Sequence, residues 1–531
     1  MIRVYNTQTR QKEELLSSEP QKIRMYVCGP TTYNYIHLGN ARPLVVFDTI
    51  RRYLKYRGFE VTYVQNFTDV DDKIINRANE EGREAHEVAE QYIAEYFKDA
   101  EALHVEEADL HPRVSHHIPE IIEVIAALVD KGHAYVRDGD VFFAVDSFPG
   151  YGKLSGRSLE DILSGARVEV DTRKEEPYDF VLWKSAKPGE PSWESPWGMG
   201  RPGWHIECSV MSMKYLGSTL DIHGGGADLI FPHHENEIAQ SEAYSGQPFV
   251  RYWLHNGFIT VNKEKMSKSL GNFFIVRDIL EKYSGNVVRL YLLSTHYRNP
   301  LDFDDTKLEE AEKALERIKN SWYLLQEALR APSSPDVNPA DRELSRELET
   351  LRAEFIMAMD DDFNTALAFS HVFALVRVIN KYLAEVQVRS RPVLEQAAQI
   401  FNEMMEVMGL NLESEAAPSA TSSTSTVGEI VLSLVEFRKQ ARQDKDYRTG
   451  DLVRDLLSRQ GIILEDSKEG SRIKSDVEPD LEELMAAVMD LRQSLRKEKN
   501  FARADQLRDI LADRNIVFED TREGSRWRFV K

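Results

Sequence analysis

Cysteine is the scarcest residue type in this chain, with only two among 531 residues, Cys28 and Cys208. A framework of several disulfides is therefore excluded, and the scarcity suits a reducing compartment. Long apolar runs are also missing: no window approaches the roughly 18 apolar residues of a membrane-spanning helix. The opening MIRVYNTQTRQKEELL lacks the apolar core of a secretory signal. We therefore expect a cytoplasmic protein that has no membrane partner.

Positive charge is in short supply as well, since 88 Asp and Glu outnumber 67 Lys and Arg and give a formal net charge of −21. A net negative field repels phosphate, which argues against general adhesion to nucleic acids or anionic membranes. The balance reverses near the end of the chain. Residues 434–474 hold ten basic against eight acidic residues, and residues 488–531 hold eleven against eight. A local basic surface is therefore expected there.

Hydrophobic patterns divide the chain into an α/β part and a helical part. Residues 22–67 predict a strand, a helix and a second strand, which is the βαβ unit of a doubly wound, Rossmann-type parallel sheet. We expect this catalytic domain over 1–304, with an inserted connective domain at about 115–200 that is rich in Trp, Pro and Gly. Helical periodicity predicts a helix bundle over 305–411, and the Ser- and Ala-rich segment 412–428 predicts a disordered linker.

Beyond that linker the sequence repeats itself. Residues 434–472 match residues 488–526 at a constant offset of 54, with fourteen identities. Each copy predicts a pair of helices closed by a short extended end, so we expect two small α-helical modules over 429–478 and 483–531. Small, basic, duplicated modules favour binding of a polyanion, although two solvated charged helices would give the same pattern.

The tetrapeptide HLGN, residues 37–40, stands where the first predicted strand passes into its helix. A helix start offers free N–H groups, Gly39 permits a close approach of the backbone, and His37 and Asn40 can donate hydrogen bonds to phosphate. Taken alone, the tetrapeptide is more typical of a solvent-facing turn.

A second short segment, KMSKS at residues 265–269, carries two lysines among small neighbours. The charges of Lys265 and Lys268 would stabilise pyrophosphate as it leaves a nucleotide. An isolated pair of lysines of this kind usually lies in a surface loop. It indicates a nucleotide site only because HLGN precedes it in the same chain.

The stretch HGGGADLIFPHHENE, residues 223–237, is a candidate metal site. Within it His233 and Glu237 are four apart, on one face of a helix if the proline opens one. A doubly wound sheet would bring Cys28 and Cys208 to the same strand ends. Two thiolates, one imidazole and one carboxylate are a donor set that suits zinc, and the alternative is a histidine pair that packs against or caps a helix.

Together these segments resemble a known family. HLGN followed by KMSKS is similar to the two signature motifs of class I aminoacyl-tRNA synthetases. YVCGPTTYNYIHLGNAR, NFTDVDDKII, GRPGWHIECS and IHGGGADLIFPHHENEIAQ resemble the cysteinyl-tRNA synthetase family. The resemblance is dense over about 20–310, thins in the helix bundle and recovers in the repeat. Asn40 departs from the class pattern, which has histidine there, and the duplicated module departs from the usual single one.

The resemblance implies an ATP-dependent ligase that acts as a monomer and joins L-cysteine to cysteine tRNA through a cysteinyl-adenylate, with Mg²⁺ accompanying ATP. It implies one Zn²⁺ that reads the substrate thiol, since an apolar pocket separates cysteine from serine by only about 1–3 kcal/mol. A purely structural zinc is the alternative. Two rival functions are a ligase that passes cysteine to a small amine and an RNA-binding relative with a decayed site.

Each expected role falls on particular residues of this sequence. The expected zinc ligands are Cys28, Cys208, His233 and Glu237. ATP binding and catalysis fall on His37, Gly39, Asn40, Lys265 and Lys268, with the adenylate supported by residues 223–226. The expected cysteine pocket is Gly29, Thr68, Trp204 and Asp228. The expected anticodon contacts are Arg492, Phe501 and Asp505 in the second copy, with Arg438, Tyr447 and Asp451 as their counterparts in the first.

Overall fold

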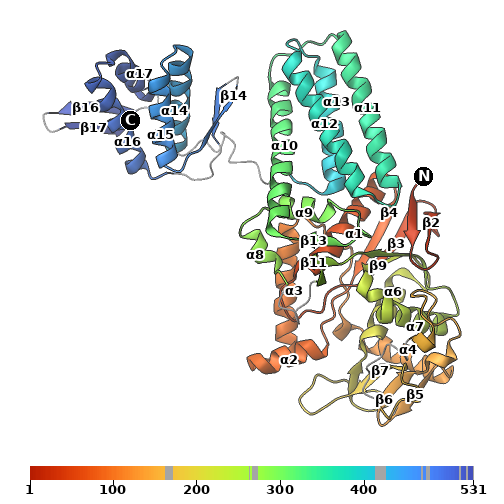
Figure 1. The fold of residues 1–531 in the computed structure, drawn as a ribbon. Helices are drawn as coiled ribbons and strands as arrows, with labels where there is room; N and C mark the ends of the chain where they lie inside the picture. Colours follow the sequence, from red (N-terminus) through yellow and green to blue (C-terminus); the bar gives the residue numbers. More distant parts are fainter. Residues whose placement is uncertain are drawn as a thin grey trace. The chain divides into compact units, whose positions relative to one another are not determined.

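A computed structural model describes most of the chain, and its contacts divide the chain into two units, Met1–Leu412 and Glu413–Lys531 (Figure 1). The described residues are 1–161, 171–261, 264–265, 273–412, 426–467, 470–473, 479–512, 516–521 and 524–529.

Unit 1 is built on a four-stranded parallel sheet in the order β10-β9-β3-β4. The strands are β3 (Lys22–Val27), β4 (Glu60–Gln65), β9 (Leu220–Gly226) and β10 (Val250–Asn256). The chain leaves β3 for β4 on one side, and β9 pairs with β3 on the other, so the strand order reverses between β3 and β9. Doubly wound sheets bind ligands in the crevice at such a reversal. The expected Rossmann-type fold is confirmed.

Helix α1 (Leu38–Tyr56) connects β3 to β4 and buries its apolar face on the sheet. Phe47 lies so close to the end of β9 that a Cβ atom on Gly224 would stand 2.3 Å from its ring. The glycine run of β9 therefore lets α1 approach the strand closely.

An insertion between β4 and β9 has a sheet and a core of its own. Its antiparallel sheet has the order β5-β6-β7-β8 and lies near α4 and α6 (Figure 1). Trp183 and Phe143 are buried in one core with residues of α4 and α6. The bounds are α4 (Ile118–Asp130), β5 (Ala134–Arg137), β6 (Asp140–Phe143), β7 (Phe180–Ser185), β8 (Gly200–Pro202) and α6 (Trp204–Leu216).

Shorter elements complete the α/β part of unit 1. They are β1 (Arg3–Asn6), β2 (Gln11–Glu14), α2 (Asp72–Glu81), α3 (Ala85–Ala102), α7 (Glu235–Ser245), β11 (Ile259–Val261), β12 (Glu264–Lys265), α8 (Val276–Leu280), α9 (Gly285–Leu293) and β13 (Leu301–Phe303).

Four long helices follow and lie side by side in Figure 1: α10 (Asp305–Arg330), α11 (Pro339–Asp360), α12 (Thr365–Glu385) and α13 (Arg391–Met408). By length and composition α12 alone among the described helices could cross a membrane. It packs against its three neighbours in the bundle and buries Phe369, Leu375 and Ile379 there.

Unit 2 contains both sequence copies, and each copy is a helix pair followed by a β-hairpin. The first copy is α14 (Thr426–Gln443), α15 (Tyr447–Arg459), β14 (Leu464–Ser467) and β15 (Gly470–Ile473). The second is α16 (Leu481–Lys497), α17 (Phe501–Ala512), β16 (Ile516–Thr521) and β17 (Gly524–Phe529). Residues 413–425 of the expected linker lie outside the described residues, and α14 begins inside the expected linker range.

One hydrophobic core serves both copies of unit 2. Phe437 and Leu457 of the first copy and Leu484 and Leu507 of the second are fully buried in the same cluster. The two copies therefore fold as one body, whereas the sequence pattern predicts separate modules.

The buried guanidinium of Arg289 ties the sheet layer to the bundle within unit 1. From α9 it forms an ion pair with Asp48 of α1, and it donates to the carbonyl of Met408 at the end of α13 at 2.7 Å and to the carbonyl of Leu103 at 3.2 Å. Both charged side chains are at most 1% exposed. Such a pair is costly to break because the remaining charge stays buried.

We predict that Arg289→Met destabilises unit 1 by about 3 kcal/mol, because the buried Asp48 carboxylate loses this partner and keeps only its ion pair with Arg52 at 2.8 Å. Urea unfolding followed by tryptophan fluorescence measures the change, because six of the seven tryptophans lie in unit 1. Lys307→Met, which removes a surface pair with Glu310 on α10, is the control and should leave the unfolding curve nearly unchanged. Equal curves for the two variants would contradict the prediction.

Candidate metal centre and nucleotide site

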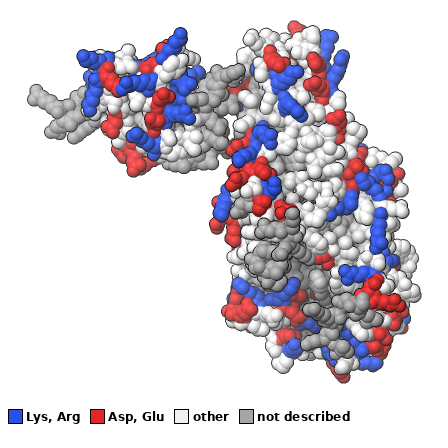
Figure 2. Space-filling view, viewed as in Figure 1, with Lys and Arg blue, Asp and Glu red and all other residues white. Residues whose placement is uncertain are grey.

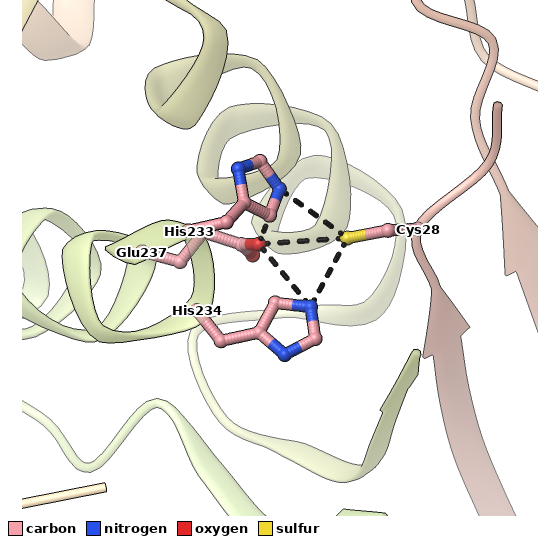
Figure 3. A group of neighbouring side chains, drawn as sticks. All are labelled: Cys28, His233, His234 and Glu237. Atoms are coloured by element: carbon pink, nitrogen blue, oxygen red, sulfur yellow. Dashed lines mark hydrogen bonds and ion pairs between the residues drawn. The ribbon is translucent and has the colours of Figure 1, made fainter. Parts of the chain in front are cut away.

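Five side chains with metal-ligating atoms converge at the carboxyl ends of β3 and β9, and Figure 3 shows four of them. The Cys28 sulfur lies at their centre. Its distances are 3.6 Å to Cys208 Sγ, 3.5 Å to His233 Nε2, 3.4 Å to His234 Nε2 and 3.5 Å to Glu237 Oε1. The four residues expected as zinc ligands are thus brought together, and His234 joins them.

The five side chains reach this point from four different segments of the chain. Cys28 directly follows β3, and Cys208 lies on α6. His233 and His234 close the short kinked turn Ile230–His234, and Glu237 lies in the first turn of α7. The expected spacing of four residues holds across this junction, because His233 Nε2 lies 3.0 Å from Glu237 Oε1.

The sequence reasoning missed His234, although it adjoins His233 in the same motif. Neighbouring residues of a regular helix point in different directions, so the pattern favours only one of the two histidines. The chain is kinked at Phe231, whose backbone is extended, and both Nε2 atoms reach the Cys28 sulfur. His234 Nδ1 bonds His255 Nε2 at 2.8 Å, and His255 Nδ1 bonds the Thr7 hydroxyl at 2.8 Å. These bonds hold the His234 ring in place.

The charges of the cluster compensate one another. Burial by itself raises the pKa of Glu237, but the adjacent His223 and His233 lower that pKa to about 2. Burial by itself lowers the pKa of His233, and Glu237 and Cys208 reverse this and raise it to about 10. A hydrogen bond with Cys28 lowers the pKa of Cys208 to about 6, against the effect of burial. Glu237 thus stays anionic and Cys208 gains thiolate character, whereas His233 stays protonated and burial raises the pKa of Cys28 well above its usual value. A metal that binds all four residues must therefore displace protons from Cys28 and His233.

Hydrogen bonds from surrounding side chains orient Glu237 and His233, as is usual for metal ligands. His223 Nε2 bonds the second oxygen of Glu237 at 2.9 Å, and its ring stacks on Trp253. His205 Nδ1 lies 2.9 Å from His233 Nδ1. These two bonds use the other polar atoms of each side chain, so that Glu237 Oε1 and His233 Nε2 face the Cys28 sulfur. The side chain of His223, expected to help hold an adenylate, therefore lies inside the protein against Glu237.

The four residues expected to contact cysteine surround this cluster at different depths. Trp204, at the start of α6, is 40% exposed and lies over the His233 ring at 4.2 Å. The buried Thr68 hydroxyl donates to Glu207 at 3.2 Å, and Asp228 lies in the short turn Ala227–Leu229 after β9. The Gly29 N–H donates to the Asn66 side chain at 3.0 Å. Trp204 and Asp228 are exposed, whereas Thr68 is buried.

The chain that follows the KMSKS motif lies beside HLGN at the start of α1. His37 is the residue before the helix, and its N–H donates to the Asn40 side-chain oxygen at 3.2 Å. The Leu38 N–H donates to the carbonyl of Phe274 at 3.0 Å, so the chain just beyond KMSKS runs beside HLGN. The backbone of Lys265 lies in β12, while its side chain and the whole of Lys268 lie outside the described residues.

The residues expected to bind tRNA divide into buried and exposed ones. Arg492 is 6% exposed and its counterpart Arg438 is fully buried, with Nε donating to the carbonyl of Gly450 at 3.1 Å. Phe501 is 55% exposed. Asp505 forms a surface ion pair with Arg508 at 3.0 Å. The arginines thus lie inside unit 2, and the aromatic side chain lies on its surface.

Comparison with known proteins assigns the class first. Residues 14–313 match the family of class I (C) tRNA synthetase catalytic domains, and residues 354–413 match the DALR domain. Two solved structures share the fold. The Mycobacterium tuberculosis methionyl-tRNA synthetase in complex with methionyl-adenylate has a TM-score of 0.54 at 16% identity, over 76% of this chain and 93% of its own. The Agrobacterium radiobacter LeuRS in its ternary complex has a TM-score of 0.56 at 12% identity, over 76% and 86%.

The fold and these matches define the catalytic domain of a class I aminoacyl-tRNA synthetase. Curated relatives are more specific. Cysteine–tRNA ligase of Pelotomaculum thermopropionicum is 59% identical, and that of Carboxydothermus hydrogenoformans is 56% identical. The matches cover 89% of this chain and 99% and 100% of the relatives. The chain belongs to the cysteine–tRNA ligase family.

We predict that Gly29→Ala disrupts the donor cluster, because the added Cβ atom would lie 1.7 Å from the backbone oxygen of Asn66. Backbone atoms on both sides must then move, and Cys28 moves with them. Cobalt uptake, read from thiolate-to-cobalt absorption, should fall to a small fraction of the wild-type signal. Gly150→Ala, whose Cβ atom would meet only side chains at 3.3 Å or more, is the control. Normal cobalt uptake by Gly29→Ala would refute the role of this contact.

Proposed function

We propose that this protein uses ATP to join L-cysteine to cysteine tRNA, with the cluster around Cys28 as the site that recognises the substrate thiol. The observation that carries this proposal is the meeting of two cysteines, His233 and Glu237 in one crevice. The names of the curated relatives support the same reaction. The DALR domain and the second unit support a tRNA acceptor over a small amine.

In the proposed first step, a carboxylate oxygen of cysteine attacks the α-phosphorus of ATP, and the bond to pyrophosphate breaks. Cysteinyl-adenylate forms without a nucleophile from the protein. His37 and Asn40 would donate hydrogen bonds to the phosphates, Gly39 would let the nucleotide lie close to the backbone, and Lys265 and Lys268 would stabilise the departing pyrophosphate. Mg²⁺ accompanies ATP.

We propose Cys28, Cys208, His233 and Glu237 as the ligands of one Zn²⁺. Zinc, when bound there, bonds a thiolate strongly and a hydroxyl poorly, so it supplies the discrimination between cysteine and serine that an apolar pocket lacks. The protein contributes the orientation of these donors through His223 and the other surrounding side chains.

The remainder of the substrate would lie beside the cluster. Trp204 is exposed enough to contact it, and the carboxylate of Asp228 would balance the ammonium group. Gly29 and Thr68 would border the same pocket from the β3 and β4 side. In the second step, the 2′-hydroxyl of the terminal adenosine of the tRNA attacks the acyl carbon and releases AMP. We expect the enzyme to act as a monomer in the cytoplasm.

The first test is ATP–pyrophosphate exchange by the purified protein with each of the twenty amino acids in turn, with zinc content determined on the same sample. Exchange with cysteine alone and about one zinc per chain would support the proposal. Exchange with serine at a comparable rate would rule out recognition of the thiol.

We predict that Cys208→Ser loses bound zinc and cysteine activation together, because a hydroxyl is a poor zinc ligand at neutral pH. Exchange should fall by at least a hundredfold, with zinc content near zero. Ser212→Ala, which removes a buried hydroxyl of the same helix that donates to the carbonyl of Ser209 at 3.2 Å, should keep both. Wild-type exchange by a zinc-free Cys208→Ser protein would exclude the proposed role of the metal.

A further inference from the structure

The two copies in unit 2 are related by an approximate twofold axis. Helix α14 packs against α17, and the equivalent pair α15 and α16 packs in the same way. Reciprocal contacts of this kind are what a twofold axis produces. Asn500 and Asp446 occupy equivalent positions at the offset of 54, and the Asn500 amide donates to the Asp446 carboxylate at 3.4 Å. A residue that meets its own counterpart lies close to the axis.

The same turn is built in both copies next to this axis. Lys445 and Lys499 have left-handed backbones with φ of 62° and 61°. Asp446 then caps α15 by accepting from the Thr449 N–H at 3.1 Å, and Asn500 accepts from the Arg503 N–H at 3.4 Å in α17. The repeated sequence therefore produces a repeated local structure, with helices α15 and α17 starting beside each other.

The first residue of each of these helices is an exposed aromatic. Tyr447 is 58% exposed and Phe501 is 55% exposed, and neither belongs to the core that the two copies share. Their positions are equivalent, one residue beyond the pair that meets at the axis. Two large aromatic rings are thus exposed at equivalent positions of the two copies. Water solvates the faces of such rings poorly.

The charges around the two rings suit a polyanion. Lys445 and Lys499 are exposed two residues before the rings. The nearby acidic groups are already paired: Arg503 contacts Asp444 at 2.9 Å and Asp446 at 3.2 Å. Glu498 is paired with Arg448. Figure 2 shows lysine and arginine side chains over the upper part of this unit, interspersed with acidic side chains, and a further acidic group at its lower edge.

We propose that Tyr447 and Phe501 are two base-stacking positions, one from each copy, that hold two unpaired bases of the tRNA anticodon loop at the same time. This rests on the proposed function, because tRNA is the RNA in question. Stacking on an aromatic face needs no particular base, and Lys445 and Lys499 supply the contacts to phosphate. Tyr447 of the first copy is then a base-binding position in addition to Phe501, the position expected in the second copy.

The approximate twofold axis limits the RNA that can use both positions. An RNA strand has a direction, so a straight strand would meet the two copies in opposite orientations. A loop turns back on itself and can offer a base to each ring. The two relatives are matched over 99–100% of their length and leave about a tenth of this chain unmatched. That share is close to the repeat offset of 54 residues.

The test measures binding of full-length protein to an in vitro transcribed cysteine tRNA. We expect Tyr447→Ala and Phe501→Ala each to raise the Kd about tenfold and the double variant to raise it about a hundredfold, as expected for the loss of one stacked base each. Tyr447→Phe should bind like wild type because the ring remains. Ile463→Ala removes a side chain of the same unit that is 57% exposed, and it is the control that should bind like wild type.

The outcomes separate this proposal from the function itself. Loss of binding in Phe501→Ala alone, with Tyr447→Ala equal to wild type, would overturn the role of the first copy. Equal binding by all variants would overturn both stacking positions. Cysteine-dependent ATP–pyrophosphate exchange should stay at the wild-type level in every variant, since the rings lie in unit 2. Absence of that exchange in the wild-type protein would instead contradict the proposed function.

Discussion

The structure of unit 1 depends on the burial of unlike charges around Cys28. An isolated buried carboxylate is very costly, so Glu237 is tolerable at zero exposure only because His223 and His233 bind its two oxygens. His223 lies on β9, His233 lies in the turn Ile230–His234, and Glu237 lies on α7. Every element that contributes a donor must therefore end at the same edge of the sheet, and the reversal of strand order between β3 and β9 provides that edge.

Strand β3 also links the donor cluster to the nucleotide motif. Cys28 follows the strand and His37 precedes α1 only nine positions later, so the two sites share one loop of the crossover. The insertion supplies α6 with Cys208 and Trp204, and α9 holds α1 against the bundle through Arg289. The site is thus assembled from both sides of the sheet.

Unit 2 shows how a duplicated sequence can give one folded body. A single helix pair exposes an apolar face, and the second copy covers that face reciprocally, so both copies contribute to one core. This packing buries Arg438 and Arg492, whose charge suggested a surface role, and leaves Tyr447 and Phe501 exposed. The surface of the unit is therefore set by the pairing of the copies.

Much of the fold could be predicted from local patterns, because strand β3, helix α1, the long helices of the bundle and the repeat each depend on nearby residues. The scarcity of cysteine, with the family resemblance, was enough to single out Cys28, Cys208, His233 and Glu237. Tertiary structure alone decided that His234 joins them, that His223 turns inward to Glu237, and that the two repeats share one core. Those facts depend on residues far apart in the sequence, and a local pattern holds no information about which distant side chain will occupy the same buried space.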